Sequence, residues 1–217
     1  MKTAILILVA MALITASVFM LWRIFLAFFN RNPKRRINRG EHLLAPADGK
    51  VISILRLDGQ ERLRLKKKYL GKIELMVSDI IGRGKGYMVS IFMSPLDVHI
   101  NRYPISGRVE SIKYKTGKFL VVNNLKNSLE NEKNEIIIKT GRSKIKVVQI
   151  AGFLARNIVC NAQPGKNAMQ GEIFGRINLG SQAVLVFPDM INGKKLNIKV
   201  RKGQKVKAGL DIIATIG

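Results

Sequence analysis

A Gly-Ser pair, Gly180–Ser181, stands just before a near-continuous apolar run in NLGSQAVLVFP (residues 178–188). Glycine and serine are common turn residues, so the pair by itself fits an ordinary turn that leads into a strand. A serine hydroxyl can also act as a nucleophile when a base takes its proton and an acid orients that base. The pair therefore has a functional meaning only if the sequence supplies the base and the acid.

The sequence offers one candidate for each of these two partners. His99 lies in MSPLDVHINRYPISG (residues 93–107), between two prolines. Asp48 lies in LLAPADGKV (residues 43–51), at a Pro-x-Asp-Gly turn before an expected strand. Each also has a structural interpretation, as a buried histidine and as a turn residue. Together with Ser181 they are the candidate parts of a nucleophile-activating relay, for which chain order is no guide.

The elements that must position these residues are mostly short strands. After residue 42, runs rich in Val and Ile alternate with Gly, Asn and Asp signals, and Thr140–Gly141 fits a hairpin connection. The best candidate for a helix, LKNSLENEKNE (residues 125–135), is mostly polar. GRGKG (residues 82–86) does not open an expected helix after a strand, so we do not interpret it as a phosphate loop.

A weak internal echo adds detail to this mainly β prediction. DGKVISIL (residues 48–55) and SGRVESIK (residues 106–113) both read Gly, base, Val, any residue, Ser, Ile. The tail VRKGQKVKAGLDIIATIG (residues 200–217) has the Gly-x-x-Val-x-x-Gly rhythm of the small β-sandwich hammerheads that carry lipoyl or biotinyl groups. We expect a barrel-like β-sandwich built from hammerhead-type hairpins, with few or short helices.

The N-terminal 29 residues differ from the rest of the chain. Residues 4–22 contain no charge and only two polar side chains, which is long enough for a transmembrane helix. A signal peptide is the alternative, with Lys2 as its basic region, but the apolar segment is too long and has no clean cleavage site. We expect a retained membrane anchor over residues 1–29, then a basic juxtamembrane linker over residues 30–42 and one domain over residues 43–217.

Basic residues predict which way the anchor is oriented. Only Lys2 precedes the apolar segment, whereas six basic residues follow it closely: Arg23, Arg31, Lys34, Arg35, Arg36 and Arg39. The positive-inside rule therefore places the domain on the cytoplasmic side of the cell membrane.

The charge of the chain is strongly positive, at +24 overall. Residues 30–217 hold 36 basic and 14 acidic side chains, a formal charge of +22. Nucleic acid and an anionic membrane surface could both attract such a domain. The anchor favours the membrane, where each nearby basic residue contributes roughly 1 kcal/mol. Aromatic residues are sparse in the basic stretches, so we expect no nucleic-acid partner.

Cysteine and histidine content limits other chemistry. A single cysteine, Cys160, excludes an intrachain disulfide, fits a reducing compartment and argues against a zinc site. We expect no metal. Cys160 lies in an expected strand, and the second histidine, His42, lies outside any motif, so both are expected to be structural.

Five stretches together resemble the pyruvoyl-dependent phosphatidylserine decarboxylases, in their short form. They are FFNRNPKRR, APADGKV, IFMSPLDVHINRYPISGRV, NIVCNAQPG and GEIFGRINLGSQAVLVFP, which extend over most of the chain. The combination of SPLDVHINRYPISG with FGxIxxGSxxxxxxP is specific. The same short form is similar to archaeal enzymes that act on archaetidylserine, so diacyl and diether lipids both stay open.

The resemblance implies that the chain cuts itself between Gly180 and Ser181. Ser181 Oγ would attack the Gly180 carbonyl, and Ser181 would become a pyruvoyl group at the start of an α chain, residues 181–217. The β chain, residues 1–180, would stay bound to it as a heterodimer. His99 would be the base and proton donor, and Asp48 would orient it.

The resemblance also implies the second reaction. The pyruvoyl ketone would form a Schiff base with the amine of an anionic serine phospholipid and withdraw the electrons left when carbon dioxide departs. The product would be the phosphoethanolamine lipid. Longer members of the family carry a second histidine where this chain has Arg102, and the run after Ser181 is more apolar here. The alternative is a membrane-anchored, non-enzymatic β-sandwich adaptor, which would keep an intact chain.

Overall fold

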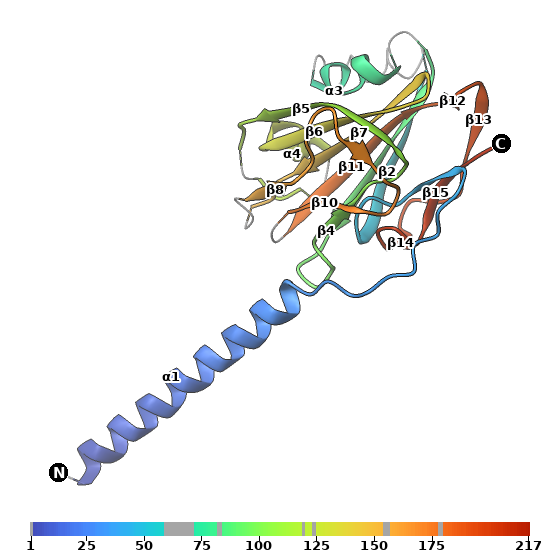
Figure 1. The fold of residues 1–217 in the computed structure, drawn as a ribbon. Coiled ribbons are helices and arrows are strands. Elements are labelled where there is room, and N and C mark those ends of the chain that lie inside the picture. Colours follow the sequence, from blue (N-terminus) through green and yellow to red (C-terminus); the bar gives the residue numbers. More distant parts are fainter. Residues whose placement is uncertain are drawn as a thin grey trace. The chain divides into compact units, whose positions relative to one another are not determined.

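The computed structural model describes residues 2–58, 72–81, 84–118, 120–122, 125–153, 157–177 and 180–217 (Figure 1). The chain divides into two compact units, Met1–Pro33 and Lys34–Gly217.

The first unit is dominated by helix α1 (Lys2–Phe29). It is long and apolar enough to cross a membrane, as far as length and composition can tell. The hydroxyls of Thr15 and Ser17 donate hydrogen bonds to carbonyl oxygens four residues earlier, each at 2.8 Å. These bonds satisfy the two polar side chains within the helix, as a lipid environment requires. The expected apolar helix is confirmed, and it suggests membrane anchoring.

The second unit is built on an antiparallel eight-stranded sheet, in the order β14-β2-β3-β11-β7-β6-β5-β9 (Figure 1). The strands are β14 (Lys205–Val206), β2 (Gly49–Leu57), β3 (Gly86–Met93), β11 (Ser181–Pro188), β7 (Ser143–Ile150), β6 (Lys133–Thr140), β5 (Gly107–Lys115) and β9 (Asn167–Ala168).

Two smaller sheets and two short helices make up the rest of the regular structure in the described part of this unit. One sheet has the order β1 (His42–Leu44), β15 (Ile212–Ile216), β13 (Lys194–Ile198), β12 (Met190–Ile191), and the other β4 (Ile100–Arg102), β10 (Ile173–Ile177), β8 (Ile158–Cys160). The helices are α3 (Lys72–Ile81) and α4 (Leu125–Glu130). The mainly β class, with curled antiparallel sheets and few helices, is confirmed.

Strand β11 explains the apolar run that follows Ser181. Ala183, Leu185 and Phe187 pack into one apolar cluster, and Val184 and Val186 pack into a second cluster that includes residues of α3 and α4. Side chains alternate between the two faces of a strand, so a strand covered on both faces is apolar at every position. Ser181 is on the same face as Ala183 and Leu185.

The two copies of the internal sequence repeat form strands β2 and β5. Each begins at the glycine of the repeat, and each shifts register between its valine and its serine, at Val51/Ser53 and at Val109/Ser111. Gly49 is needed for its φ of 145° and for space, because a Cβ there would lie 2.1 Å from a backbone oxygen. The repeat therefore encodes a glycine entry followed by a β-bulge.

The remaining local predictions have mixed outcomes. The hairpin at Thr140–Gly141 is confirmed, because Thr140 pairs with Ser143 and Gly141 has a φ of 57°. Of the helix candidate over residues 125–135, only Leu125–Glu130 is helical (α4), and the last three residues belong to strand β6. Helix α3 was not predicted. Of GRGKG, residues 82 and 83 lie outside the described residues, and Gly86 opens β3.

Candidate active site

Ser181 is the first residue of β11, a strand bonded to β3 on one side and to β7 on the other. Its cross-strand partner is Met93, the last residue of β3. Ser181 is completely buried, and its Oγ donates a hydrogen bond to Met93 Sδ at 3.5 Å. A thioether is a weak acceptor, so little holds the hydroxyl proton in place.

Gly180 meets the conformational demand of the residue before the serine. Its φ of 67° is in the left-handed region that favours glycine, whereas a Cβ there would meet nothing within 4 Å. Its carbonyl group is packed against Gly152, two residues after β7. A Cβ on Gly152 would lie 1.6 Å from the Gly180 oxygen. Position 180 therefore requires glycine because of its backbone angle. Position 152 requires glycine because the Gly180 carbonyl fills the space that a side chain would need.

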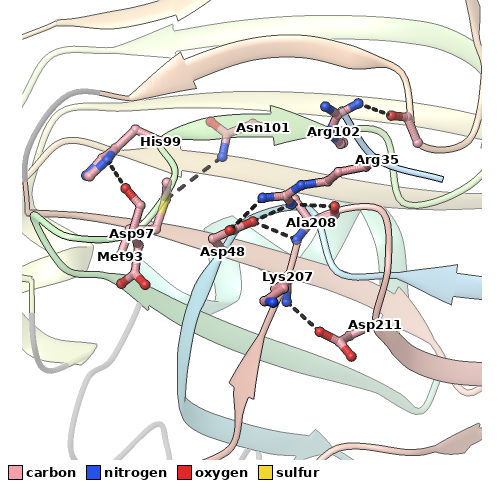
Figure 2. A network of polar contacts seen from close by, with 11 residues as sticks. Arg35, Asp48, Met93, Asp97, His99, Asn101, Arg102, Lys207, Ala208 and Asp211 are labelled. Atoms are coloured by element: carbon pink, nitrogen blue, oxygen red, sulfur yellow. Dashed lines mark hydrogen bonds and ion pairs between the residues drawn. The ribbon is translucent and has the colours of Figure 1, made fainter. Parts of the chain in front are cut away.

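His99 lies between β3 and β4 and is 3% exposed. Its Nδ1 lies 2.9 Å from the carbonyl oxygen of Asp97 (Figure 2). A carbonyl can only accept, so Nδ1 carries the proton, and the lone pair of the neutral ring is on Nε2. The backbone oxygen of His99 accepts the N–H of Ile177 at 3.2 Å. This bond ties His99 to the segment that leads into Gly180–Ser181.

Asp48 makes its contacts elsewhere. Its two carboxylate oxygens accept the two terminal nitrogens of Arg35 at 2.6 and 2.7 Å, and one also accepts the N–H of Ala208 at 2.8 Å (Figure 2). Arg35 donates to the Ala208 carbonyl as well, at 2.7 Å. Both side chains are nearly buried, at 6% and 10% exposure. The bidentate pair joins the segment before β1 to the turn before β2, and the bonds to Ala208 connect both to the C-terminal part of the chain.

The three candidate residues are therefore not joined by hydrogen bonds within the described parts of the chain. Ser181 bonds to Met93, and Asp48 bonds to Arg35 and Ala208. The sheet does pair Ser181 with Met93 at the end of β3, and His99 is the last residue of the loop that follows Met93. The relay stays a prediction.

Comparison with known proteins decides the family. The model of the phosphatidylserine decarboxylase family matches residues 22–214. The chain belongs to this family. Phosphatidylserine decarboxylase proenzyme of Chlorobaculum tepidum is 36% identical over 195 residues, 89% of this chain and 79% of that protein. The proteins of the same description from Syntrophus aciditrophicus and Carboxydothermus hydrogenoformans are 37% and 36% identical, covering 95% and 92% of this chain and 84% and 83% of theirs.

Family membership favours the enzyme over the adaptor and gives meaning to residues that the sequence did not single out. Met93 is one, since its sulfur contacts Ser181 and also accepts Asn101 Nδ2 at 3.9 Å (Figure 2). Gln149 in turn donates to Asn101 Oδ1 at 3.0 Å. Gly152 is another, and only the fold reveals its contact with Gly180.

Arg102, in the SPLDVHINRYPISG stretch, has a structural hydrogen bond. Its Nη1 donates to the Gly171 carbonyl at 2.9 Å. Burial is the largest influence lowering the pKa of Arg102, the charge of Arg35 lowers it further, and the Asp48 carboxylate opposes both. Arginine stays protonated even so, and cannot serve as the general base that a histidine provides.

Both candidate catalytic side chains are buried in the described structure. Ser181 and His99 are 0% and 3% exposed. Three surface hollows of this unit are lined by other residues, for example residues 198–204. Within the described parts of the chain, no group of three His, Cys, Asp or Glu side chains could hold a metal ion.

Proposed function

We propose that this chain is a self-processing, pyruvoyl-dependent decarboxylase that converts a phosphatidylserine-type lipid into the phosphoethanolamine lipid and carbon dioxide. The observation that carries the proposal is the family match over residues 22–214, which includes the Gly180–Ser181 pair. The named relatives are proenzymes. Cleavage between Gly180 and Ser181 would convert such a proenzyme into the enzyme.

Ser181 is the nucleophile of this cut. Its Oγ bonds to the Gly180 carbonyl carbon as the amide bond breaks, which gives an ester. Removal of the α-hydrogen of residue 181 then expels the carboxylate of Gly180, and water replaces the amino nitrogen, which leaves as ammonia. The burial of Ser181 and the left-handed φ of Gly180 support this step, because they exclude competing water and hold an unusual turn at the bond.

His99 is the base. Its neutral ring has the lone pair on Nε2 because Nδ1 donates to the Asp97 carbonyl. A ring fixed in one tautomer can take the Ser181 proton and return a proton later, to the carbon that has lost carbon dioxide.

Asp48 is the acid that orients His99. Arg35 engages its carboxylate in the uncut chain, and the Asp97 carbonyl accepts the His99 Nδ1 proton. This role therefore requires Asp48 to leave Arg35 and to replace the Asp97 carbonyl at Nδ1 during the cut. Opening a buried ion pair is costly, so substitutions of Asp48 and Arg35 test this exchange directly.

The pyruvoyl group supplies an electron sink for decarboxylation. Ser181 fits this cofactor, because the cut would leave residue 181 fixed at the start of a strand with partners on both sides. Four strand pairings would hold the α chain (residues 181–217) on the β chain (residues 1–180): β11 with β3, β11 with β7, β14 with β2, and β15 with β1.

The domain boundaries and location follow from the sequence. We assign residues 1–29 to a membrane anchor, residues 30–42 to a basic linker, and residues 43–217 to the decarboxylase domain. The excess of basic residues after the anchor supports a cytoplasmic domain at the cell membrane. The short form suits a serine phospholipid with either diacyl or archaeal diether tails.

Ser181→Ala tests the proposal. The full chain is reconstituted in vesicles of phosphatidylcholine and carboxyl-labelled phosphatidylserine, and both cleavage and released carbon dioxide are measured. We expect the variant to stay uncut and inactive. Ser90→Ala is the matched control, since it removes another fully buried hydroxyl, from β3, that has no hydrogen-bond partner in the described structure. Cleavage and decarboxylation by Ser181→Ala would contradict the proposal.

A further inference from the structure

Three large apolar side chains are exposed around the Ser181 end of the long sheet. Leu96, Val121 and Phe153 are 71%, 50% and 62% exposed. Single exposed apolar residues are common on protein surfaces and need no explanation. These three, however, lie on three separate loops at the Ser181 end of the sheet. We refer to them as the rim.

The strand order places two rim residues beside Ser181. Leu96 comes three residues after the end of β3, and Phe153 comes three residues after the end of β7. Strand β11, which starts at Ser181, runs antiparallel between these two strands. Neighbouring strands are about 4.8 Å apart, so the two loops leave the sheet on either side of Ser181.

Asn131 places the third rim residue. Its buried side chain bonds to both backbone groups of Leu120, at 2.9 and 2.7 Å, and donates to the Ala151 carbonyl at 2.8 Å. The segment that holds Val121 is thereby fixed beside the segment that holds Phe153. The next residue, Val122, points inward and is fully buried.

Leu96 is held outward by a closed turn. The backbone N–H and the hydroxyl of Ser94 donate to the Asp97 carboxylate at 2.8 and 2.7 Å, and the Asp97 N–H donates back to the Ser94 carbonyl at 3.0 Å. Such an Asx-type arrangement fixes the two residues between them. The side chain therefore has an apolar surface presented to solvent by a well-ordered turn.

We propose that the rim inserts into the apolar region of a phospholipid bilayer, so that the Ser181 end of the sheet faces the lipid. This inference rests on the proposed function, in which the substrate is a lipid. Two features favour a bilayer over a protein partner. The chain has a helix that could cross a membrane, and residues 30–217 carry a formal charge of +22, which complements an anionic surface.

The test measures lipid contact at each rim position in the full chain. Leu96, Val121 and Phe153 are replaced one at a time by cysteine in a Cys160→Ser chain, and each is labelled with an environment-sensitive fluorophore. Vesicles of phosphatidylcholine and phosphatidylserine contain lipids with quenchers on their acyl chains. Met190→Cys is the matched control, because Met190 is 49% exposed and lies beyond the opposite end of β11, about 23 Å away.

Helix α1 is expected to hold every variant on the vesicle, so quenching reports how the domain faces the bilayer. We expect about twofold quenching at the three rim positions and none at position 190. Equal quenching at all four positions, or none at the rim, overturns the proposal. Leu96→Trp and Phe153→Trp in a Trp22→Phe chain, read with brominated lipids, give the same answer if a label disturbs folding.

Cleavage is scored on the same samples, which separates this inference from the proposed function. A cut chain with unquenched rim labels contradicts the rim alone. A chain that is never cut between Gly180 and Ser181 contradicts the proposed function, whatever the labels report.

Discussion

Gly152→Ala adds one methyl group directly beside the bond that is proposed to break. The added Cβ would lie 1.6 Å from the Gly180 oxygen and 2.7 Å from the Gly180 carbon. Real Cβ atoms essentially never approach another heavy atom closer than 3.0 Å. The Gly152 backbone and the Gly180 carbonyl must therefore separate by at least the difference, 1.4 Å, and a shift of the carbonyl displaces the reacting bond. This carbonyl is the group that Ser181 Oγ attacks.

A shift of this size is large for a reacting atom. Misplacement by about 1 Å can cost about 100-fold in rate, because the reacting atoms leave the near-attack geometry. We therefore expect Gly152→Ala to slow self-cleavage about 100-fold or more. The assay is a time course of the uncut chain and the residue 1–180 fragment on a denaturing gel during cell-free synthesis.

Gly107→Ala is the matched control for general destabilisation. A Cβ there would lie 2.3 Å from the Lys139 oxygen, a similar backbone collision. This collision lies far from Ser181. Lys133 pairs with Ile150 at the Ser181 end of the sheet, and Lys139 is six residues further along β6, about 20 Å from that end. Folding of both variants is measured in a Ser181→Ala chain, which stays uncut. Cleavage of Gly152→Ala within about threefold of the parent rate, or equal slowing by Gly107→Ala, would refute the reasoning.

Two further predictions concern charge. Removing one partner of a buried ion pair costs about 3–5 kcal/mol, so Asp48→Asn and Arg35→Gln should both lower the free energy of unfolding by about that amount. Only Asp48→Asn should slow cleavage of the folded chain, and equal slowing by both would show that Asp48 acts through the fold. Burial raises the pKa of Tyr103 to about 12, with smaller contributions from Cys160 and Glu172. The folded state thus favours the neutral phenol of Tyr103. This preference stabilises the fold fully below the unfolded pKa of about 10, and the stabilisation is lost as pH rises toward the folded pKa of about 12. Denaturant unfolding at pH 9–12 should show this loss in the parent and not in Tyr103→Phe, and equal loss in both would contradict the assignment.

The sequence was sufficient for much of the fold because local patterns determine it. Val- and Ile-rich runs became strands, and the repeated Gly-base-Val-x-Ser-Ile stretch became two strands with the same bulge. The unbroken apolar run after Ser181 needed the tertiary structure for its explanation, since helices α3 and α4 cover one face of β11. Helix α3 itself was missed because its apolar positions span only 10 residues.

The site was less predictable, because its contacts join residues far apart in the chain. Nothing in the sequence near Gly152 indicates that the carbonyl of Gly180 occupies the space of a side chain at this position. Asp48 is similar, since a turn aspartate gives no local sign that it binds Arg35 and Ala208 rather than His99. Ser181, Gly180 and His99 could be proposed from residue type and resemblance, whereas their neighbours had to come from the strand register.

The central claim is that the chain cuts itself between Gly180 and Ser181, and the intact mass of the purified protein under denaturing conditions tests it most directly. The account predicts two species. One is residues 1–180, and the other is residues 181–217 lighter by one ammonia than the serine-started peptide. A single species at 24.3 kDa that stays uncut in vesicles with phosphatidylserine and yields no fragment with hydroxylamine would contradict it.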